Sequence, residues 1–428
     1  MKNIGLIIKQ ARVDQGIKQL NLAKGICSIS YLSKVENNQL VPSDEILVNL
    51  LNRLSITITE VSDEEEILTL NSIKELYKTA IIYRDHKSIS NEIVKIEEKR
   101  TIFKNQVYSI NSLLFLSRLY LISGKEMSRV ESLIEFIELH EENLTNYQKC
   151  VFNINKALKS FYTDEYLQSV EYIEQALEDQ NTIVLENWEL ADLYNVMAIC
   201  YLVNNYNYST IEFARKALNI YRDLLLFNRA IDCYISIGIS YKRNYKYKES
   251  EESFQAAYRL LKDRGLFDFE GIITQNLGTL SAIKGDSNKA IEYFLSSMDC
   301  KKTTEGYYVT ILSIIQEYSK LKSPENILMW CEKGLEMYSK AKEKNLSYYY
   351  HFKIFEAEQV GGAEFTNILI KAIKYFELKK DYRHVYKYAV LLAKYYYLNK
   401  KLKNSGIYYQ LANEALLLKN KLLNWEDL

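Results

Sequence analysis

Small side chains recur at a regular spacing through the middle of this chain. Five of them, each about forty positions after the last, are Ser117, Ala157, Ala198, Gly238 and Gly278. From the second of these on, further small residues follow at a spacing of twelve (Ser169, Thr210, Ser250, Ala290) and at a spacing of nineteen (Ala176, Ala217, Ala257, Ser297). Two helices per repeat, closely packed where small side chains permit it, explain these spacings. The repeat therefore predicts a stack of helix pairs, an α-solenoid.

The composition agrees with a helical, soluble protein. The 428 residues include only two prolines, whereas an average chain has about 5% proline, so almost nothing interrupts helices. No apolar run approaches the length of about 20 residues that spans a bilayer, so no membrane association is expected. The N-terminal segment 1–16 alternates polar and apolar side chains and lacks the apolar core of a signal peptide. We therefore expect a cytoplasmic protein.

No catalytic or metal-binding motif is present. The six cysteines are Cys27, Cys150, Cys200, Cys233, Cys300 and Cys331. They are far apart, without a C-x-x-C pair or a nearby histidine to complete a zinc site, so reduced and mostly buried thiols are expected. H-E-x-x-H, G-x-S-x-G and P-loop motifs are absent, and the four histidines are scattered. The sequence predicts no enzyme activity, no catalytic residues, no metal and no cofactor.

The repeat resembles that of tetratricopeptide (TPR) helix pairs. An aromatic residue such as Tyr201 or Tyr241 follows the first small residue after three positions, as in that pattern. The closing proline and early tryptophan of TPR units are missing, and the period exceeds the usual length of about 34 residues, so helices or links must be longer. With weaker repeats beyond residue 300, about eight pairs are expected from residue 68 to the end. The resemblance implies a right-handed TPR-like α-solenoid.

The concave surface of such a solenoid is lined mainly by the first helix of each pair. Against the TPR pattern, the inward positions are Asn111, Arg118, Asn155, Asp192, Asn195, Asp232, Gln275, Asn276, Thr279 and Gln316. An amide side chain offers both a donor and an acceptor to a peptide backbone, and Arg118 could bind a carboxylate through two hydrogen bonds. Each residue alone could equally be a solvated polar position. As a set they predict a peptide-binding surface.

The segment 1–60 has a different pattern, that of several short helices. An amphipathic helix ends at Gly16, a second covers residues 18–25, the turn lies at 25–27, and a third helix covers 28–37. Another helix begins after Pro42, with Ser43 as N-cap and acidic residues in its first turn. The expected core consists of Ile4, Ile8, Ala11, Ala23, Ile26, Leu32, Val35, Ile46, Leu47, Leu50 and Leu51. This is a compact helix-turn-helix.

This segment resembles the DNA-binding domain of lambda-repressor-like (XRE-type) regulators. The matching residues are Gln19, Leu22, Ala23, the turn Gly25-Ile26, the run "SYLSKVEN" from Ser30 to Asn37, and Pro42. The third helix of such a domain enters the major groove of double-stranded DNA. The resemblance implies that Ser28, Ser30 and Tyr31 face bases or phosphates and that Lys34, Asn37 and Asn38 contact phosphates. Gln19 would brace the third helix or contact the DNA backbone.

The charge of this head is small. Residues 1–55 carry seven basic and four acidic side chains, a net charge of +3, in a chain whose total charge is zero. One copy is not expected to bind DNA tightly, because phosphate contacts dominate affinity. Two heads on a dimeric body are therefore expected to share one operator.

A helix-turn-helix head on a TPR-like body resembles the Rap, Rgg, NprR, PlcR and PrgX superfamily, most closely its NprR and PlcR branch. The resemblance implies a helix-turn-helix domain at 1–62, a linker at 63–70 and a peptide-binding and dimerisation domain at 71–428. It also implies a cytoplasmic homodimer, or a higher oligomer once peptide is bound, whose binding to an operator is controlled by a short oligopeptide pheromone. The alternative is a Rap-like adaptor that sequesters a response regulator or promotes its dephosphorylation.

Overall fold

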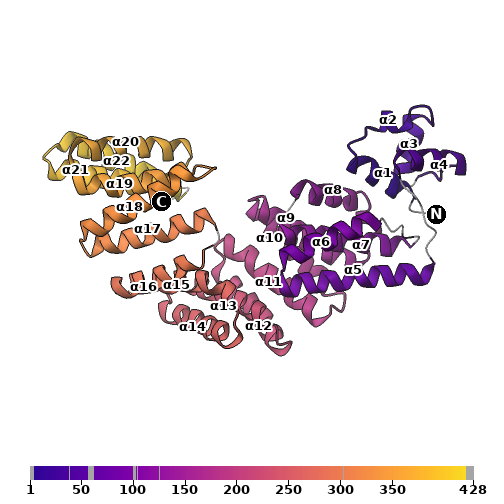
Figure 1. Cartoon of the computed structure of the whole chain (residues 1–428), viewed down its shortest axis with the longest axis horizontal. Coiled ribbons are helices and arrows are strands. Elements are labelled where there is room, and N and C mark those ends of the chain that lie inside the picture. The colour runs from indigo at the N-terminus through magenta and orange to yellow at the C-terminus, as the bar shows by residue number, and fades with distance from the viewer. Residues whose placement is uncertain are drawn as a thin grey trace. The chain divides into compact units, whose positions relative to one another are not determined.

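All regular secondary structure in the described part of the chain is helical. The computed structural model describes residues 4–37, 39–55, 62–99, 103, 105–124, 126–301 and 303–420 (Figure 1). Contacts divide the chain into two compact units, Met1–Arg264 and Gly265–Leu428. Within the described ranges, no helix combines the length and the apolar character needed to cross a bilayer.

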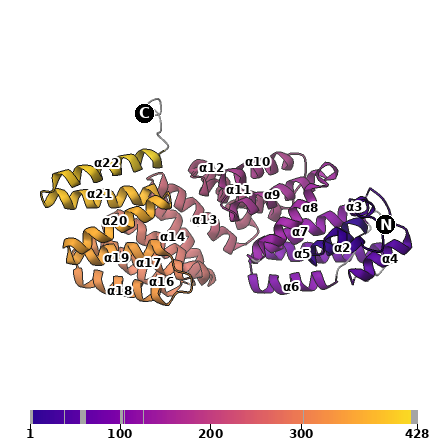
Figure 2. The ribbon, with the colours of Figure 1, turned by 90° about the horizontal axis from the view of Figure 1, so that it is seen from above.

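The first unit contains the head and five helix pairs. The head helices are α1 (Ile4–Asp14), α2 (Gln19–Ala23), α3 (Ile29–Glu36) and α4 (Asp44–Arg53). The pairs are α5 (Asp63–Tyr83) and α6 (His86–Lys99), α7 (Gln106–Ser123) and α8 (Met127–Glu138), α9 (Asn146–Tyr162) and α10 (Tyr166–Gln180), α11 (Asn187–Val203) and α12 (Asn207–Asp223), and α13 (Phe227–Arg243) and α14 (Tyr247–Arg264). A short 3-10 helix, η1 (Glu141–Asn143), precedes α9. Figure 2 shows these helices from above.

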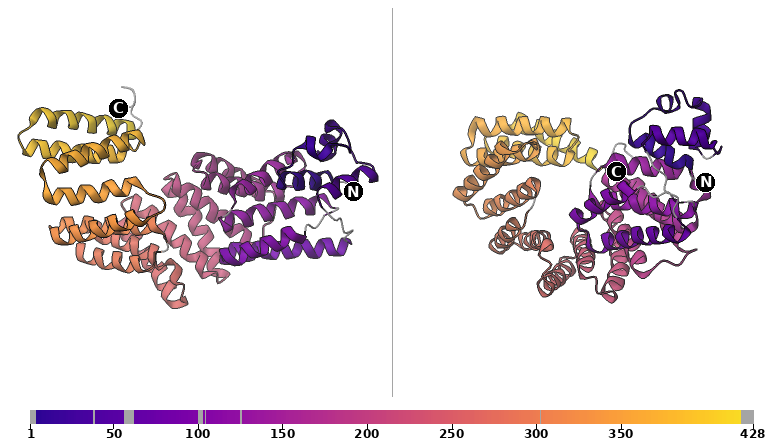
Figure 3. Two further views of the ribbon diagram at one scale, coloured as in Figure 1. Left: turned by 45° about the horizontal axis from the view of Figure 1, so that its top comes forward. Right: turned by 45° about the vertical axis from the view of Figure 1, so that its right-hand side comes forward.

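The second unit continues the same architecture. After the 3-10 helix η2 (Phe267–Phe269), its pairs are α15 (Glu270–Ile283) and α16 (Ser287–Asp299), α17 (Thr304–Lys320) and α18 (Pro324–Lys340), α19 (Leu346–Val360) and α20 (Gly362–Leu378), and α21 (Tyr382–Leu398) and α22 (Leu402–Lys419). Figure 3 shows these helices stacked one after another. The described residues of the two units thus form nine pairs, one more than the sequence predicted.

Helix length, not link length, produces the long repeat period. The helices α11, α12 and α13 each have 17 residues, and three residues separate each from the next helix. The middle residue of each link has a left-handed backbone, at Asn205 (φ 61°), Leu225 (φ 56°) and Tyr245 (φ 60°). The same short link therefore recurs after each of these helices, and two helices with two links complete the period.

The small residues predicted from the repeat lie where helices touch. Ser117, Ala157, Ala198, Ser169 and Ala176 are each at most 1% exposed. The corresponding residues of the later repeats are buried too, Thr210, Ser250, Ala290, Ala217, Ala257 and Ser297 among them. The predicted all-α fold with a helix-turn-helix head and a TPR-like body is confirmed.

Two glycines are required because a ring occupies the place of a side chain. A Cβ atom on Gly238 would lie 2.8 Å from the Phe254 ring, and one on Gly278 would lie 2.7 Å from the Phe294 ring. Each phenylalanine belongs to the second helix of the same pair as its glycine, and both rings are at most 2% exposed. The rings cannot move aside easily, because protein cores are close-packed.

We expect Gly238→Ala to lower the free energy of unfolding by about 1–3 kcal/mol, the cost of overpacking. Gly406 is the matched control, since it lies in α22 with nothing within 4 Å of an added Cβ. There Gly406→Ala should raise stability by about 0.5–1 kcal/mol, because alanine loses less backbone entropy in a helix. Urea unfolding of both variants checks the pair, and equal effects would contradict the packing assigned to Gly238.

Residues 63–70 form the first turns of α5 and not the linker that the sequence analysis expected. Ser62 caps the helix: its hydroxyl accepts from the Glu65 amide at 3.3 Å and the Glu65 carboxylate accepts from the Ser62 amide at 2.8 Å. Four acidic residues in the first turn complement the helix dipole. The acidic run 63–66 is thus the start of the body's first helix.

Candidate functional sites

The third helix of the head presents a polar row on its outer side. Leu32 and Val35 are fully buried in the head core, whereas Ser30 and Lys34 are exposed. Tyr31 is half-buried against that core. Ser28 is exposed and caps α3, its hydroxyl accepting from the Tyr31 amide at 3.1 Å. The outward side chains at the start of α3 are therefore those that the resemblance assigned to DNA.

A buried carboxylate holds α3 in place. Glu36 is 0% exposed and accepts two hydrogen bonds from Arg12, to Oε1 at 2.5 Å and to Oε2 at 2.9 Å. Gln19 donates to the same Oε2 at 2.7 Å, and Arg12 also donates to the Ile17 carbonyl at 3.0 Å. The hydrogen bond from Gln19 to Glu36 fits the predicted brace of the third helix, and contact of Gln19 with the DNA backbone stays a prediction. Neither Arg12 nor Glu36 was predicted from the sequence to hold the third helix.

The remaining DNA-contact predictions lie at the end of α3. Asn37 is exposed at the C-cap, and its Oδ1 accepts from Lys9 Nζ at 3.4 Å. Asn38 lies outside the described residues. DNA contact by Ser28, Ser30, Tyr31, Lys34, Asn37 and Asn38 stays a prediction.

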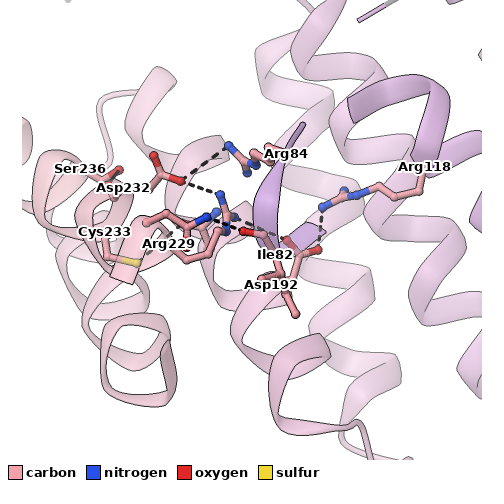
Figure 4. Close-up of polar contacts among 10 residues, drawn as sticks. Ile82, Arg84, Arg118, Asp192, Arg229, Asp232, Cys233 and Ser236 are labelled. Atoms are coloured by element: carbon pink, nitrogen blue, oxygen red, sulfur yellow. Dashed lines mark hydrogen bonds and ion pairs between the residues drawn. The ribbon is translucent and has the colours of Figure 1, made fainter. Parts of the chain in front are cut away.

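A charged network lies inside the body of the first unit (Figure 4). Arg118 donates to Asp192 Oδ2 at 2.6 Å, and both side chains are 3% exposed. Arg229, which is 1% exposed, donates to Asp232 Oδ2 at 2.6 Å and lies 3.8 Å from Asp192 Oδ1. Arg84, at the end of α5, lies 3.7 Å from Asp232. Three guanidinium groups thus share two carboxylates. Burial and the neighbouring charge of Arg229 lower the pKa of Arg84.

The amides predicted in this unit mostly join helices. Asn155 is 0% exposed and donates to the Leu114 carbonyl at 2.9 Å and to Ser117 Oγ at 2.7 Å, which ties α9 to α7. Asn195 is 1% exposed, and its Oδ1 accepts from Cys233 Sγ at 3.7 Å. Half-buried Asn111 accepts from Gln148 at 2.9 Å.

Four of the predicted inward residues, Arg118, Asn155, Asp192 and Asn195, are therefore buried. Their neighbours on adjacent inner helices cover them. A peptide role for these residues stays a prediction, and it requires that the surrounding helices shift.

Helix α5 reaches this network from the head side. Tyr77 stacks on Phe115 of α7 with ring centroids 4.6 Å apart and meets Trp188 of α11 edge-on at 5.5 Å. At the helix end, the Ile82 carbonyl accepts from Asn228 Nδ2 of α13 at 2.6 Å. The helix that begins directly after the head thus ends beside Asp232 (Figure 4).

The second unit has a small pocket among α15, α16 and α17. It encloses about 250 Å³ and is lined by Thr279, Ala282, Ile283, Phe294, Ser313, Gln316, Glu317 and Lys320. Two of the predicted residues, Thr279 and Gln316, therefore share one pocket. Drug-sized ligands occupy about 300–1,000 Å³, so this pocket suits a side chain of a larger ligand.

Of the other two residues predicted in this unit, Gln275 contacts the pocket lining. Gln275 donates to Ser313 Oγ at 3.2 Å and accepts from Thr310 Oγ1 at 2.8 Å. Asn276 is 9% exposed and donates to the Ile272 carbonyl of its own helix at 2.9 Å. Ser313, Glu317 and Lys320 also line the pocket, and the sequence analysis missed them.

Four of the cysteine thiols are protonated because they are buried. Burial raises the pKa of the Cys150, Cys200, Cys233 and Cys331 thiols to about 12, so they are neutral. All six thiols are free. In the part of the chain that the structure describes, no three His, Cys, Asp or Glu side chains are grouped to hold a metal ion.

Known proteins match both parts of the chain. Residues 8–61 match the helix-turn-helix family. The transcriptional activator NprA of Geobacillus stearothermophilus is 28% identical over 407 residues, which are 92% of this chain and 98% of NprA. The regulatory protein RapF of Bacillus subtilis (strain 168) is 21% identical over 336 residues, covering 76% of this chain and 86% of RapF.

Solved structures share the fold. The apo form of the quorum sensor NprR from B. thuringiensis superimposes with a TM-score of 0.72 at 18% identity, over 83% of this chain and 99% of that chain. NprR in complex with its cognate peptide NprX gives a TM-score of 0.54 at 18% identity, over 81% of this chain and 99% of that chain.

Proposed function

We propose that this chain is a member of the Rap, Rgg, NprR, PlcR and PrgX superfamily, most like its NprR and PlcR branch, and that it is a transcriptional regulator whose promoter binding is controlled by a short signalling peptide. It acts in the cytoplasm as a homodimer whose two heads share one operator. The similarity to the activator NprA over nearly the whole of both chains supports this function.

The observation that carries the DNA-binding role is the construction of α3. Ser28, Ser30 and Lys34 point outward from a helix whose other side is buried and whose end is fixed by Glu36. A recognition helix has to be held rigidly, because base contacts need defined geometry. Arg12 and Gln19 provide that support without using any outward side chain.

A peptide ligand fits the amide-rich inner positions of the body. The quorum sensor NprR, which shares this fold, forms a complex with its cognate peptide NprX. In this chain, Thr279 and Gln316 line the pocket of the second unit and are the predicted contacts that a ligand side chain reaches first. In the first unit, half-buried Asn111 and partly exposed Asp232 are the most accessible predicted positions.

Helix α5 supplies a route from ligand to head. It begins at Asp63, directly after the head, and its far end is bonded to α13 through Asn228. A ligand that moves α13 relative to α11 displaces the end of α5, the helix that follows the head in the sequence. The peptide has to bind one arrangement more tightly than the other, because equal affinity for both shifts no population.

The pocket assignment predicts that Gln316→Ala weakens peptide binding by about 5- to 30-fold, the loss of one or two polar contacts of about 1 kcal/mol each. Calorimetry would use synthetic peptides of about five to ten residues from small secreted reading frames beside the gene. Gln410→Ala is the matched control, since Gln410 is exposed on α22, away from the pocket lining. Equal affinities of the two variants would refute the pocket.

A Rap-like adaptor function is the second candidate, favoured by the similarity of the body to RapF. Such an adaptor would bind a response regulator and would not need a DNA-binding head. The head of this chain has a complete helix-turn-helix core, which favours the regulator. Binding of a purified response regulator that persists when the head is removed by proteolysis would identify the adaptor function.

A further inference from the structure

The last helices of the chain are strongly basic although the chain as a whole is neutral. Residues 362–420 contain eleven lysines and arginines against four acidic residues, an excess of seven positive charges. The head has an excess of only three over a similar length. The larger positive charge therefore lies at the end of the second unit, on α20, α21 and α22.

On α21, the charges form a row on the outer side of the helix. Val385, Tyr388, Ala389, Leu392 and Ala393 are at most 1% exposed and define the buried side. The exposed residues Arg383, Lys387 and Lys394 follow one another at intervals of four and seven. Because an α-helix has about 3.6 residues per turn, this spacing places all three on one line opposite the buried side.

Two exposed tyrosines flank that row. Tyr386 is 38% exposed and Tyr397 is 60% exposed, and both lie on the same half of the helix as the basic residues. We call Arg383, Tyr386, Lys387, Lys394 and Tyr397 the α21 strip. Tyrosine hydroxyl groups, like lysine and arginine, commonly donate hydrogen bonds to phosphate oxygens.

The cations of the α21 strip are paired less closely than other lysines of the protein. None of Arg383, Lys387 and Lys394 forms an ion pair with a described carboxylate, whereas elsewhere lysines such as Lys216, Lys340 and Lys353 do. The carboxylate on the same helix turn, Asp381, is bonded to His384 at 2.6 Å. Glu358 of α19 interacts electrostatically with Lys387, and burial lowers the pKa of that lysine. The strip therefore presents its unpaired positive charge to the solvent mainly at Arg383 and Lys394.

We propose that the α21 strip is a second DNA-contact surface that binds the phosphate backbone of duplex DNA without reading its sequence. The proposal rests on the proposed function in one respect, namely that the protein binds DNA. Phosphate contacts supply most non-specific affinity and release condensed counterions. The head has an excess of only three positive charges, so it can supply only part of this non-specific affinity. The α21 strip can supply more, because it places three cations and two tyrosine donors in one row.

The test compares DNA binding by full-length variants at several salt concentrations. In Arg383→Ala/Lys387→Ala/Lys394→Ala, affinity should fall by at least about tenfold at 0.1 M salt, equally for operator and random duplexes. The slope of log affinity against log salt should decrease by about 3, since each lost phosphate contact removes about 0.9. Arg383→Lys with Lys387→Arg and Lys394→Arg keeps the charge and should bind like the parent protein.

The matched control removes three exposed lysines of the same unit outside the strip, as Lys289→Ala/Lys322→Ala/Lys342→Ala. In this control, the slope of log affinity against log salt should equal that of the parent protein. An unchanged affinity and slope in the strip variant would overturn the proposal, as would an equal loss in the control, because net charge alone would then be responsible.

The two proposals fail in different ways. Absence of any operator preference in the parent protein refutes the proposed function, yet the strip is still tested by random DNA. If the strip variant still prefers the operator and its affinity depends on salt as steeply as that of the parent protein, the DNA-contact role of the strip is refuted and the proposed function is not. A strip variant that loses binding to an acidic partner protein while keeping all DNA binding also refutes it.

Discussion

Glu36→Ala should abolish DNA binding by unfolding the head. The substitution leaves the Arg12 guanidinium in the interior of the head without its carboxylate and removes the acceptor of Gln19. Breaking a buried ion pair in this way costs about 3–5 kcal/mol. A domain of about 60 residues has little more stability than that, since small cores are marginal. Gel-shift titration and the helical circular dichroism of the full chain measure the two effects.

Two controls separate this effect from a loss of charge. Glu45→Ala removes a carboxylate exposed in the first turn of α4 and should leave DNA binding nearly unchanged. Arg12→Met with Glu36→Leu replaces the pair by apolar side chains and should restore most of the stability. Normal DNA binding by Glu36→Ala would show that the network does not hold α3.

Asp192→Ala should destabilise the inner helices of the first unit by about 3–5 kcal/mol. Asp192 is the carboxylate between two buried guanidinium groups, bonded to Arg118 at 2.6 Å and lying 3.8 Å from Arg229. Its removal leaves Arg118 without a charged partner in a site that is 3% exposed. Hydrogen exchange of amides in α7, α11 and α13, followed by mass spectrometry, reports the local opening free energy.

Asp232→Ala is the comparison for this prediction. The Asp232 side chain is 24% exposed, so water can solvate Arg229 in its place and the loss should be smaller. Arg118→Met added to Asp192→Ala should recover part of the stability, because it removes the unpaired charge. Equal protection from hydrogen exchange in Asp192→Ala and Asp232→Ala would contradict the claim that Asp192 contributes more to stability than Asp232.

The architecture could be predicted from the sequence because small residues have to lie where helices touch. The positions from Ser117 to Gly278 indicated the helix pairs, and the apolar residues around Leu32 and Val35 indicated the head core. The linker that the resemblance implied at 63–70 is part of α5 instead, because Ser62 and Glu65 form a capping box that starts the helix there. A Ser followed three residues later by Glu was the available signal.

The candidate sites were predicted less completely, since burial depends on contacts between distant helices. Asp192 and Arg118 are 74 residues apart in sequence, and no local sequence pattern predicts that they form an ion pair. Arg84 and Asn228 connect helices that are four pairs apart along the chain. A weak signal existed for Glu36, because it follows Leu32 by one helical turn and so lies on the apolar side of α3.

Footprinting of the full-length protein on the DNA around its own gene, with and without peptides from neighbouring small secreted reading frames, tests the central claim most directly. The account predicts protection of a palindromic or directly repeated site at moderate salt, with an affinity that changes when one of the peptides is present. No sequence-specific protection under any condition, or protection that is indifferent to every peptide that binds the body, would contradict it.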